Sequence, residues 1–275
     1  MKQYDIRVVG LDLDGTVFDD NKNISPRTVA AIRAACEKGV AVLPATGRFL
    51  KGLPESFVGL PGVRYALTSN GASVVELATG RKLVEQNLPD ETAAAVTEYL
   101  MGCDCMCNAF IGGCGWASNH LFPQLHEWYG ESGLESYVRS FEHPDLSPLE
   151  IVRAHPGQVE KISAKFRTVA DRDRAAEAIA AFGCEISNSF SDNIEVNARG
   201  VDKGTGLIAL ARVLGYGPEN VMAIGDSNND IAMLRKAGLG VAMGNATAET
   251  IAAADVVTLS NNEDGVAAAL EKYLL

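Results

Sequence analysis

The sequence predicts an α/β fold, a doubly wound parallel sheet whose chain is interrupted by an inserted α+β domain. Short apolar strands alternate with helical segments at both ends of the chain, and the polar residues of interest follow the strands. Between residues 83 and 197 this alternation gives way to a separate mixture of helices and hairpin-like strands. We therefore expect one domain from residues 1–82 and 198–275, and a second from residues 83–197.

The first part of the chain shows the strand and helix signals of a parallel sheet. An apolar run over Ile6–Leu11 predicts the first strand, and Ser25 followed by Pro26 is typical of a helix start. Two more apolar runs predict strands over Val40–Leu43 and Tyr65–Thr68. Strands that alternate with helices in this way are expected to run parallel, with ligands beyond their carboxyl ends.

The same alternation returns after the insert. Glycines typical of helix ends follow several of the expected helices. We expect helices over Lys203–Leu214, Asn229–Lys236, Thr247–Ala254 and Glu263–Tyr273, and strands over Val221–Gly225, Leu239–Met243 and Val256–Leu259.

The insert carries its own helix and strand signals. We expect Asp90 to cap a helix over Glu91–Met101, and a hairpin to turn near Gly112 and Gly113. Further expected elements are strands over Val159–Phe166, Cys184–Ser187 and Ile194–Val196, and a helix over Ala170–Phe182.

Composition limits the classes of partner. With 275 residues, 47% of them hydrophobic, the chain can bury a sizeable core. Its 24 basic and 35 acidic residues give a net charge of −11, which argues against nucleic acid and anionic membranes as partners. It lacks a signal-peptide pattern and any apolar run of the roughly 18 residues that span a membrane. Six cysteines without a disulfide-scaffold pattern suit a reducing compartment, so we expect a cytoplasmic protein.

The end of the first strand carries two carboxylates, Asp12 and Asp14, one residue apart. Residues i and i+2 of a strand share a face, so both side chains can leave the strand in one direction, and Gly15 permits the turn that follows. The two acids repel, and a hard cation such as Mg²⁺ relieves that repulsion. The pattern suits an attacking carboxylate beside an acid/base carboxylate, although a strand with an acidic turn is the alternative.

Three further patches follow in chain order: Thr46, Lys203, and the run Asp226 to Asp230. Alone, each fits a plain role as a strand-end hydroxyl, a solvated lysine or a helix-capping turn. Together with Asp12-Leu13-Asp14-Gly15-Thr16, their order and spacing resemble the haloacid dehalogenase (HAD) superfamily of aspartyl-nucleophile phosphatases. The long insert resembles its Cof-type branch, which has a large α/β cap on a Rossmann-like core. Branch features are the runs 45–48, 69–72, 201–204 and 242–246.

The resemblance implies a role for each motif residue. Asp12 would be the nucleophile that forms an aspartyl-phosphate, and Asp14 would protonate the leaving alcohol and then activate water. Thr46 and Lys203 would hold the phosphoryl oxygens, with Asn229 on the phosphate side.

The resemblance also implies a Mg²⁺ site. Its ligands would be the carboxylates of Asp12 and Asp226 and the backbone carbonyl of Asp14, with Asp230 supporting either Lys203 or the metal. Three residues that follow strands, Gly47, Arg48 and Asn70, are candidates for contact with the phosphate or the leaving group, with surface-turn roles as the alternative.

The expected activity is hydrolysis of small phosphomonoesters such as sugar phosphates, by a monomer or weak homodimer. A phosphomutase that uses the same aspartyl-phosphate and a non-catalytic phosphosugar-binding protein remain alternatives. The cysteines at 103, 105, 107 and 114 lack the paired spacing of a structural zinc site, and we expect them to be small residues of the insert. The aromatic side chains of Trp116, His120, Trp128 and Tyr129 could face a substrate or fill the core of the insert.

Overall fold

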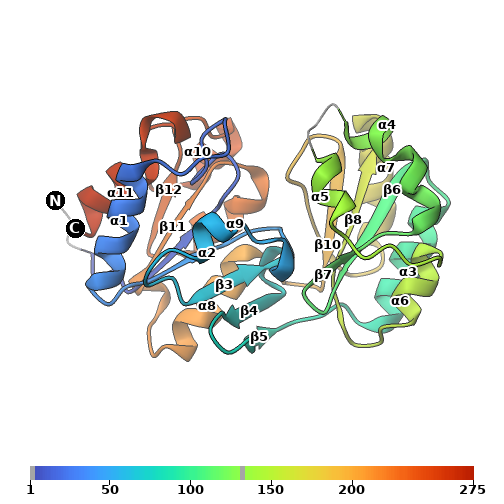
Figure 1. Ribbon diagram of the computed structural model, residues 1–275, viewed down its shortest axis with the longest axis horizontal. Helices are drawn as coiled ribbons and strands as arrows, with labels where there is room; N and C mark the ends of the chain where they lie inside the picture. Colours follow the sequence, from blue (N-terminus) through green and yellow to red (C-terminus); the bar gives the residue numbers. More distant parts are fainter. Residues whose placement is uncertain (1–3, 131–133) are drawn as a thin grey trace. The chain divides into compact units, whose positions relative to one another are not determined.

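A computed structural model describes residues 4–130 and 134–275, and the chain divides into two compact units (Figure 1). The first takes in the chain as far as Gly47, together with Leu53–Glu85 and Asp202–Leu275. The second consists of Arg48–Gly52 and Gln86–Val201. Among the described residues, no helix is long and apolar enough to cross a membrane.

The first unit is built on a parallel sheet, which five strands form among the described residues in the order β13-β12-β11-β1-β2. Leu11 at the end of β1 pairs with Ile224 on β11 and with Pro44 on β2, so these central strands end at the same level. The strands are β1 (Val8–Leu11), β2 (Ala41–Pro44), β11 (Val221–Gly225), β12 (Leu239–Ala242) and β13 (Val256–Val257).

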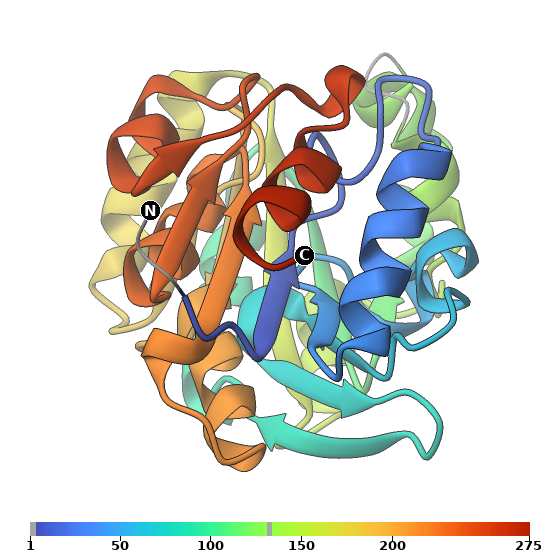
Figure 2. The ribbon, with the colours of Figure 1, turned by 90° about the vertical axis from the view of Figure 1, so that its left-hand side faces the viewer.

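Helices cover both faces of this sheet (Figure 2). On one face, Ile32 of α1 and Leu270 of α11 share a core with Val9 of β1, and the two helices lie side by side. On the other face, Leu207 of α8 packs with Val8. The helices are α1 (Pro26–Glu37), α2 (Glu55–Val58), α8 (Lys203–Val213), α9 (Ile231–Lys236), α10 (Ala248–Ala253) and α11 (Gly265–Tyr273). This layering confirms the predicted fold class.

A small antiparallel sheet accompanies the parallel one. It has the order β3-β4-β5, and its strands are β3 (Tyr65–Thr68), β4 (Ser73–Glu76) and β5 (Arg81–Glu85). An isolated parallel bridge between Ala45 and Leu67 joins β3 to the chain just after β2. Strands β4 and β5 were not predicted from the sequence, and they extend the first unit to Glu85.

The second unit has an antiparallel sheet of order β7-β6-β8-β10-β9, with α3, α6 and α7 packed on one face and α4 and α5 on the other. Asp90 does not cap α3, and that prediction was wrong: Pro89 is the N-cap, and Asp90 Oδ1 accepts a hydrogen bond from the Gly157 N–H at 2.6 Å. The strands are β6 (Cys105–Ile111), β7 (Cys114–Trp116), β8 (Val159–Phe166), β9 (Glu185–Ser187) and β10 (Asn193–Asn197). The helices are α3 (Asp90–Met101), α4 (Leu125–Tyr129), α5 (Glu135–Arg139), α6 (Pro148–Arg153) and α7 (Val169–Ala180).

An aromatic cluster explains why Arg48–Gly52 groups with the second unit. The ring of Phe49 lies 5.2 Å from the rings of both Phe110 and Phe141, within the range of favourable aromatic pairs. Trp128 and Tyr129 are buried in the same cluster and therefore belong to the core of this unit.

Three of the insert's clustered cysteines, Cys103, Cys105 and Cys107, pack as small residues of its core. Cys107 is buried against the helices, and Cys103 and Cys105 pack beside it on the same core. Burial raises the pKa of Cys105, and it raises the pKa of Cys107 to about 12, so these thiols stay protonated. All six cysteines lie in the described part of the chain, and none forms a disulfide there.

Candidate active site

The level strand ends bring three predicted site residues to one edge of the parallel sheet. Asp12 follows β1 and donates its backbone N–H to the Ile224 carbonyl at 3.0 Å. Thr46 follows β2 and donates its backbone N–H to the Leu67 carbonyl at 3.0 Å. Asp226 follows β11, the strand beside β1. The carboxyl-end edge expected from the sequence is therefore where these residues gather.

Lys203 enters the site from the first position of α8. The helix begins there because Asp202 caps it: the Asp202 carboxylate accepts the Thr205 N–H at 2.8 Å, and Thr205 Oγ1 accepts the Asp202 N–H at 2.9 Å. This reciprocal capping box fixes the backbone beside Lys203 and so fixes where its side chain starts.

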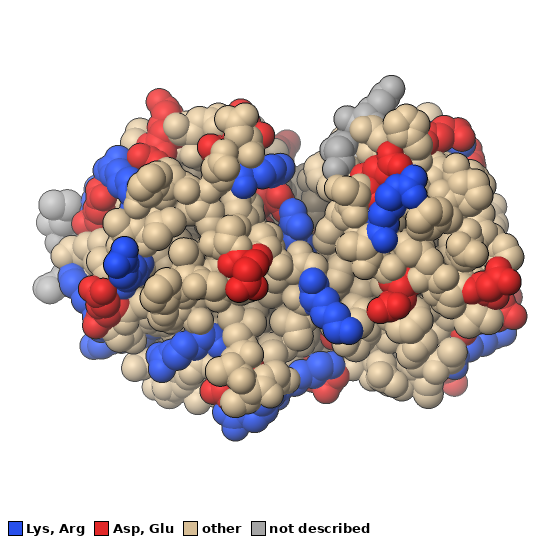
Figure 3. All heavy atoms as spheres, in the orientation of Figure 1, with Lys and Arg blue, Asp and Glu red and all other residues tan. Residues whose placement is uncertain are grey.

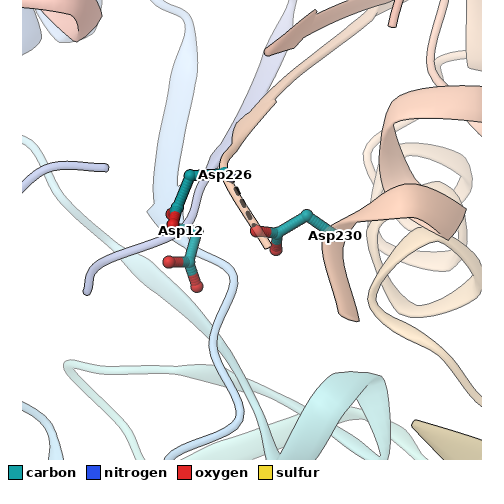
Figure 4. A group of neighbouring side chains, drawn as sticks. All are labelled: Asp12, Asp226 and Asp230. Carbon is teal, nitrogen blue, oxygen red and sulfur yellow. Dashed lines mark hydrogen bonds between the residues drawn. The ribbon is translucent and has the colours of Figure 1, made fainter. Parts of the chain in front are cut away.

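The Lys203 ammonium joins two carboxylates. Its Nζ donates to Asp12 Oδ1 at 2.6 Å and to Asp230 Oδ1 at 2.7 Å, and all three side chains are buried. Burial alone would lower the pKa of Lys203, but Asp12 and Asp230 outweigh it and raise that pKa, so the side chain stays charged. The other oxygen of Asp230, Oδ2, accepts the backbone N–H groups of Asp226 and Ser227, both at 3.0 Å (Figure 4).

These contacts favour the role of Asp230 as a support for Lys203. Both of its oxygens already accept hydrogen bonds from the protein, and one of them fixes the loop that carries Asp226. Gly225 makes this possible, because a Cβ there would lie 2.5 Å from Asp230 Cγ. A side chain at residue 225 would therefore displace the carboxylate that holds Lys203.

Three carboxylates converge on this point. Ligand oxygens of Asp12, Asp226 and Asp230 lie within 4.8 Å of one another (Figure 4). Burial raises the pKa of Asp12 well above its usual range despite Lys203, and the two neighbouring acids raise it further. Burial, followed by the charge of Asp230, raises the pKa of Asp226 to about 6. A cluster of three desolvated carboxylates, two of them paired with Lys203, fits a hard divalent cation such as Mg²⁺.

Thr16 and Asn245 also hold this cluster, although neither was predicted as a site residue. Thr16 Oγ1 donates to Asp226 Oδ1 at 2.7 Å, and Asn245 Nδ2 donates to the Gly15 carbonyl at 2.8 Å. Gly15 has a φ of +85°, and a Cβ there would lie 2.6 Å from Asp226 Oδ2. The Asp-Gly-Thr turn in the sequence was the available signal for Thr16.

Asp14 stands apart from the carboxylate cluster. Its side chain is 38% exposed and forms an ion pair with the exposed Lys22, at 3.1 Å between Nζ and Oδ1. An exposed ion pair of this kind contributes little to stability. The structure therefore gives Asp12 and Asp14 different surroundings, one buried and fixed by Lys203 and the other partly open.

The remaining predicted residues divide into two groups. Asn229 Nδ2 donates to Asn70 Oδ1 at 3.5 Å, and Asn70 donates its backbone N–H to the Thr46 carbonyl at 3.1 Å, so these three belong to one network. Gly47 follows Thr46 directly and ends the first segment of the first unit. Arg48 falls in the second unit, where its guanidinium carbon lies 5.1 Å from the ring centre of Tyr137.

A comparison with protein families identifies the family of the chain. Residues 9–270 match the family model for haloacid dehalogenase-like hydrolases. The chain belongs to this family. Asp12 and Asp226 both lie inside the matched range, as does the whole insert. The family membership that the sequence motifs implied is thus confirmed.

Several proteins that are similar over their full length are named phosphatases. The chain is 34% identical to 5-amino-6-(5-phospho-D-ribitylamino)uracil phosphatase YcsE of Bacillus subtilis, over 100% of this chain and 98% of that protein. It is 29% identical to a phosphoglycolate phosphatase of Methanoculleus marisnigri, over 98% and 97% of the two chains. The solved HAD subclass IIB sugar phosphatase BT4131 has a TM-score of 0.83 and 26% identity, over 97% and 98% of the two chains. These similarities place the chain among the phosphoric monoester hydrolases of the HAD superfamily.

Proposed function

We propose that this protein hydrolyses small phosphomonoesters, such as sugar phosphates or similar metabolites, through an aspartyl-phosphate on Asp12 with Mg²⁺ as cofactor. The observation that carries the proposal is the position of Lys203. Its buried ammonium binds Asp12 and Asp230 at the strand ends, beside Asp226. A fixed cation next to a fixed carboxylate is the arrangement that attack on a phosphate dianion requires, because two anions must approach each other.

In the first half of the reaction, a carboxylate oxygen of Asp12 attacks phosphorus and the bond to the leaving oxygen breaks. Asp14, in its protonated form, gives its proton to that oxygen and the alcohol departs. Lys203 holds Oδ1 of Asp12 and so orients the carboxylate, while Thr46 and Asn229 bind phosphoryl oxygens. In the second half, the Asp14 carboxylate takes a proton from water, the water oxygen attacks phosphorus, and Asp12 and inorganic phosphate are released.

The carboxylates of Asp12 and Asp226, with the backbone carbonyl of Asp14, would hold Mg²⁺. When bound, the ion neutralises charge on the phosphoryl oxygens and on the two carboxylates. Thr16 keeps Asp226 in place through its 2.7 Å hydrogen bond. Asp230 acts through Lys203 and the Asp226 backbone rather than as a direct ligand.

The substrate class rests on the relatives. The names of YcsE, the phosphoglycolate phosphatase and BT4131 denote action on small phosphorylated molecules of different shape. We propose that residues 83–197 act as the cap that selects among such substrates, and that Gly47, Arg48 and Asn70 contribute near the phosphate or leaving group. A phosphomutase or a phosphosugar-binding protein would need the same phosphate site, and product analysis separates them.

We also propose that the protein works as a monomer or weak homodimer in the cytoplasm, where its free thiols stay reduced. On the face drawn in Figure 3, acidic and basic side chains of the described residues are interspersed, without a continuous basic patch. That distribution, with a net charge of −11, supports a small-molecule substrate over nucleic acid or a membrane surface.

The proposal is tested with purified protein, Mg²⁺ and a panel of phosphorylated metabolites, by measuring released phosphate. Asp12→Asn, which is nearly isosteric and lacks the anionic nucleophile, is expected to fold and to lose turnover by at least about 10³-fold. Isomerised substrate without phosphate release would identify a mutase. Ligand binding without turnover by the wild-type protein would identify a binding protein.

A further inference from the structure

The turn Ser69–Asn70–Gly71 is strained and buried, although it lies in neither the sheet nor a long helix. Its three residues have φ values of +50°, +56° and +96°, all in the left-handed region. Serine avoids this region and asparagine enters it at some cost, so each non-glycine residue there costs about 1–3 kcal/mol. Such a conformation persists only where the surrounding structure holds it.

The turn touches three separate pieces of the site. The Asn70 N–H donates to the Thr46 carbonyl at 3.1 Å, and Asn70 Oδ1 lies 3.5 Å from the Asn229 amide nitrogen, at the outer limit of a hydrogen bond. Gly71 packs against the start of α8, where a Cβ would collide with the Asp202 carbonyl next to Lys203. The turn thereby contacts the loop after β2, the loop after β11 and the helix that carries the lysine.

The Asn229 side chain is held from two sides. Ser227 Oγ donates to Asn229 Oδ1 at 2.9 Å, and the Asn229 amide nitrogen points to Asn70 Oδ1. An amide held at both ends keeps one orientation, which matters for a group that must offer its N–H to a phosphoryl oxygen. Asn70 supplies the second contact, from the left-handed backbone of the turn.

We propose that Asn70 is a positioning residue: its side chain orients the Asn229 amide, from a strained turn whose backbone contacts Thr46 and the start of the helix that carries Lys203. This inference rests on the proposed phosphatase function. It differs from direct substrate contact, because Asn70 acts through Asn229. The strain of the turn is then a cost in stability that the site's geometry requires.

The test compares Asn70→Gly with a matched control, Asp264→Gly. Glycine adopts positive φ without strain, so both variants keep their backbone. Asp264 (φ +59°) lies at the start of α11, where its carboxylate pairs with Arg27 of α1 at 3.8 Å. We expect Asn70→Gly to melt at or above the wild-type temperature, yet to lose about 3–10-fold in kcat/KM, as for one neutral hydrogen bond. Asp264→Gly is expected to keep wild-type kcat/KM.

A double-mutant cycle separates positioning from contact. In an Asn229→Ala background, Asn70→Gly is expected to cost less than 2-fold, because the group it orients has gone. The inference is overturned if Asn70→Gly lowers kcat/KM by the same factor in both backgrounds, or if it leaves kcat/KM at the wild-type value. It is also overturned if Asn70→Gly fails to fold while Asp264→Gly folds. If the wild-type protein releases no phosphate from any substrate, the proposed function fails instead.

Discussion

Replacing Lys203 by methionine tests whether this one ammonium holds the carboxylate cluster together. Methionine nearly preserves the length and volume of the side chain and removes its charge. In the wild-type protein Nζ lies 2.6 Å from Asp12 Oδ1 and 2.7 Å from Asp230 Oδ1, with the lysine 1% exposed. The variant therefore leaves three close carboxylates without this cation.

The size of the effect follows from burial. Removing one partner from a buried ion pair costs about 3–5 kcal/mol, because the remaining charge is uncompensated. At about 2–4 °C per kcal/mol for a chain of this size, metal-free Lys203→Met should melt about 6–20 °C below the wild type at pH 8. At pH 5 the deficit should shrink, because protons on the raised-pKa carboxylates replace the lost cation. Turnover should fall by at least about 10²–10³-fold.

The assay is thermal melting of metal-free protein at both pH values, with phosphate release measured in Mg²⁺. Lys161→Met is the matched control, since Lys161 is equally buried and pairs with Glu195 at 2.6 Å within the second unit. Lys161→Met should lower the melting temperature, because Glu195 loses its partner, but the variant should still hydrolyse an artificial aryl phosphate. A Lys203→Met protein with wild-type melting at pH 8 and wild-type turnover would refute the reasoning.

Three further predictions follow from the same geometry. EDTA should abolish phosphate release and added Mg²⁺ should restore it, whereas undiminished activity in metal-free buffer would contradict a cation at Asp12 and Asp226. The pKa of Asp226 is raised to about 6 in the folded protein, so the folded state binds a proton at this group more tightly than the unfolded state does. This proton binding stabilises the fold fully below the ordinary pKa of an aspartate, and the stabilisation is lost as the pH rises through 6. Between pH 7 and pH 4, the free energy of unfolding of the metal-free protein should therefore rise by about 1–3 kcal/mol because of this group. The Asp226→Asn variant should lack that rise, and equal pH dependence of stability in both proteins would exclude the raised pKa of Asp226. A variant in which a Gly/Ser linker replaces residues 86–201 should show smaller differences in kcat/KM between metabolites. This variant also carries Phe49→Ser, because the ring of Phe49 packs on Phe110 of the removed unit and would become exposed. An unchanged ranking of substrates would count against the insert as the selective cap.

The sequence was most informative where local signals and topology agree. Apolar runs over Val221–Gly225 and Val159–Phe166 match β11 and β8 residue for residue, because each is bounded by a clear polarity change. Asp12 and Asp226 could be placed at one sheet edge, because the residues that follow neighbouring parallel strands lie beyond the same edge of the sheet.

Other features were missed, and some of them depend on contacts between residues that are distant in sequence. Phe49 groups with the second unit through rings that are distant in sequence, so its segment was expected elsewhere. The β4–β5 hairpin was missed, although Val74, Val75 and Leu83 on either side of the turn at Gly80 were a usable signal. Thr16 could be recognised as a support for Asp226 only once the two loops, 210 positions apart, were brought together.

The most direct test of the account is to identify the phosphorylated residue. Asp14→Asn should slow release of phosphate from the intermediate, since the base that activates water is absent. After brief reaction with an aryl phosphate and Mg²⁺, borohydride reduction should convert the phosphorylated carboxyl into homoserine, which peptide mass spectrometry locates. We expect homoserine at residue 12 and at no other aspartate position. Trapped phosphate on another residue, or unmodified Asp12 in a sample that is turning over, would contradict it.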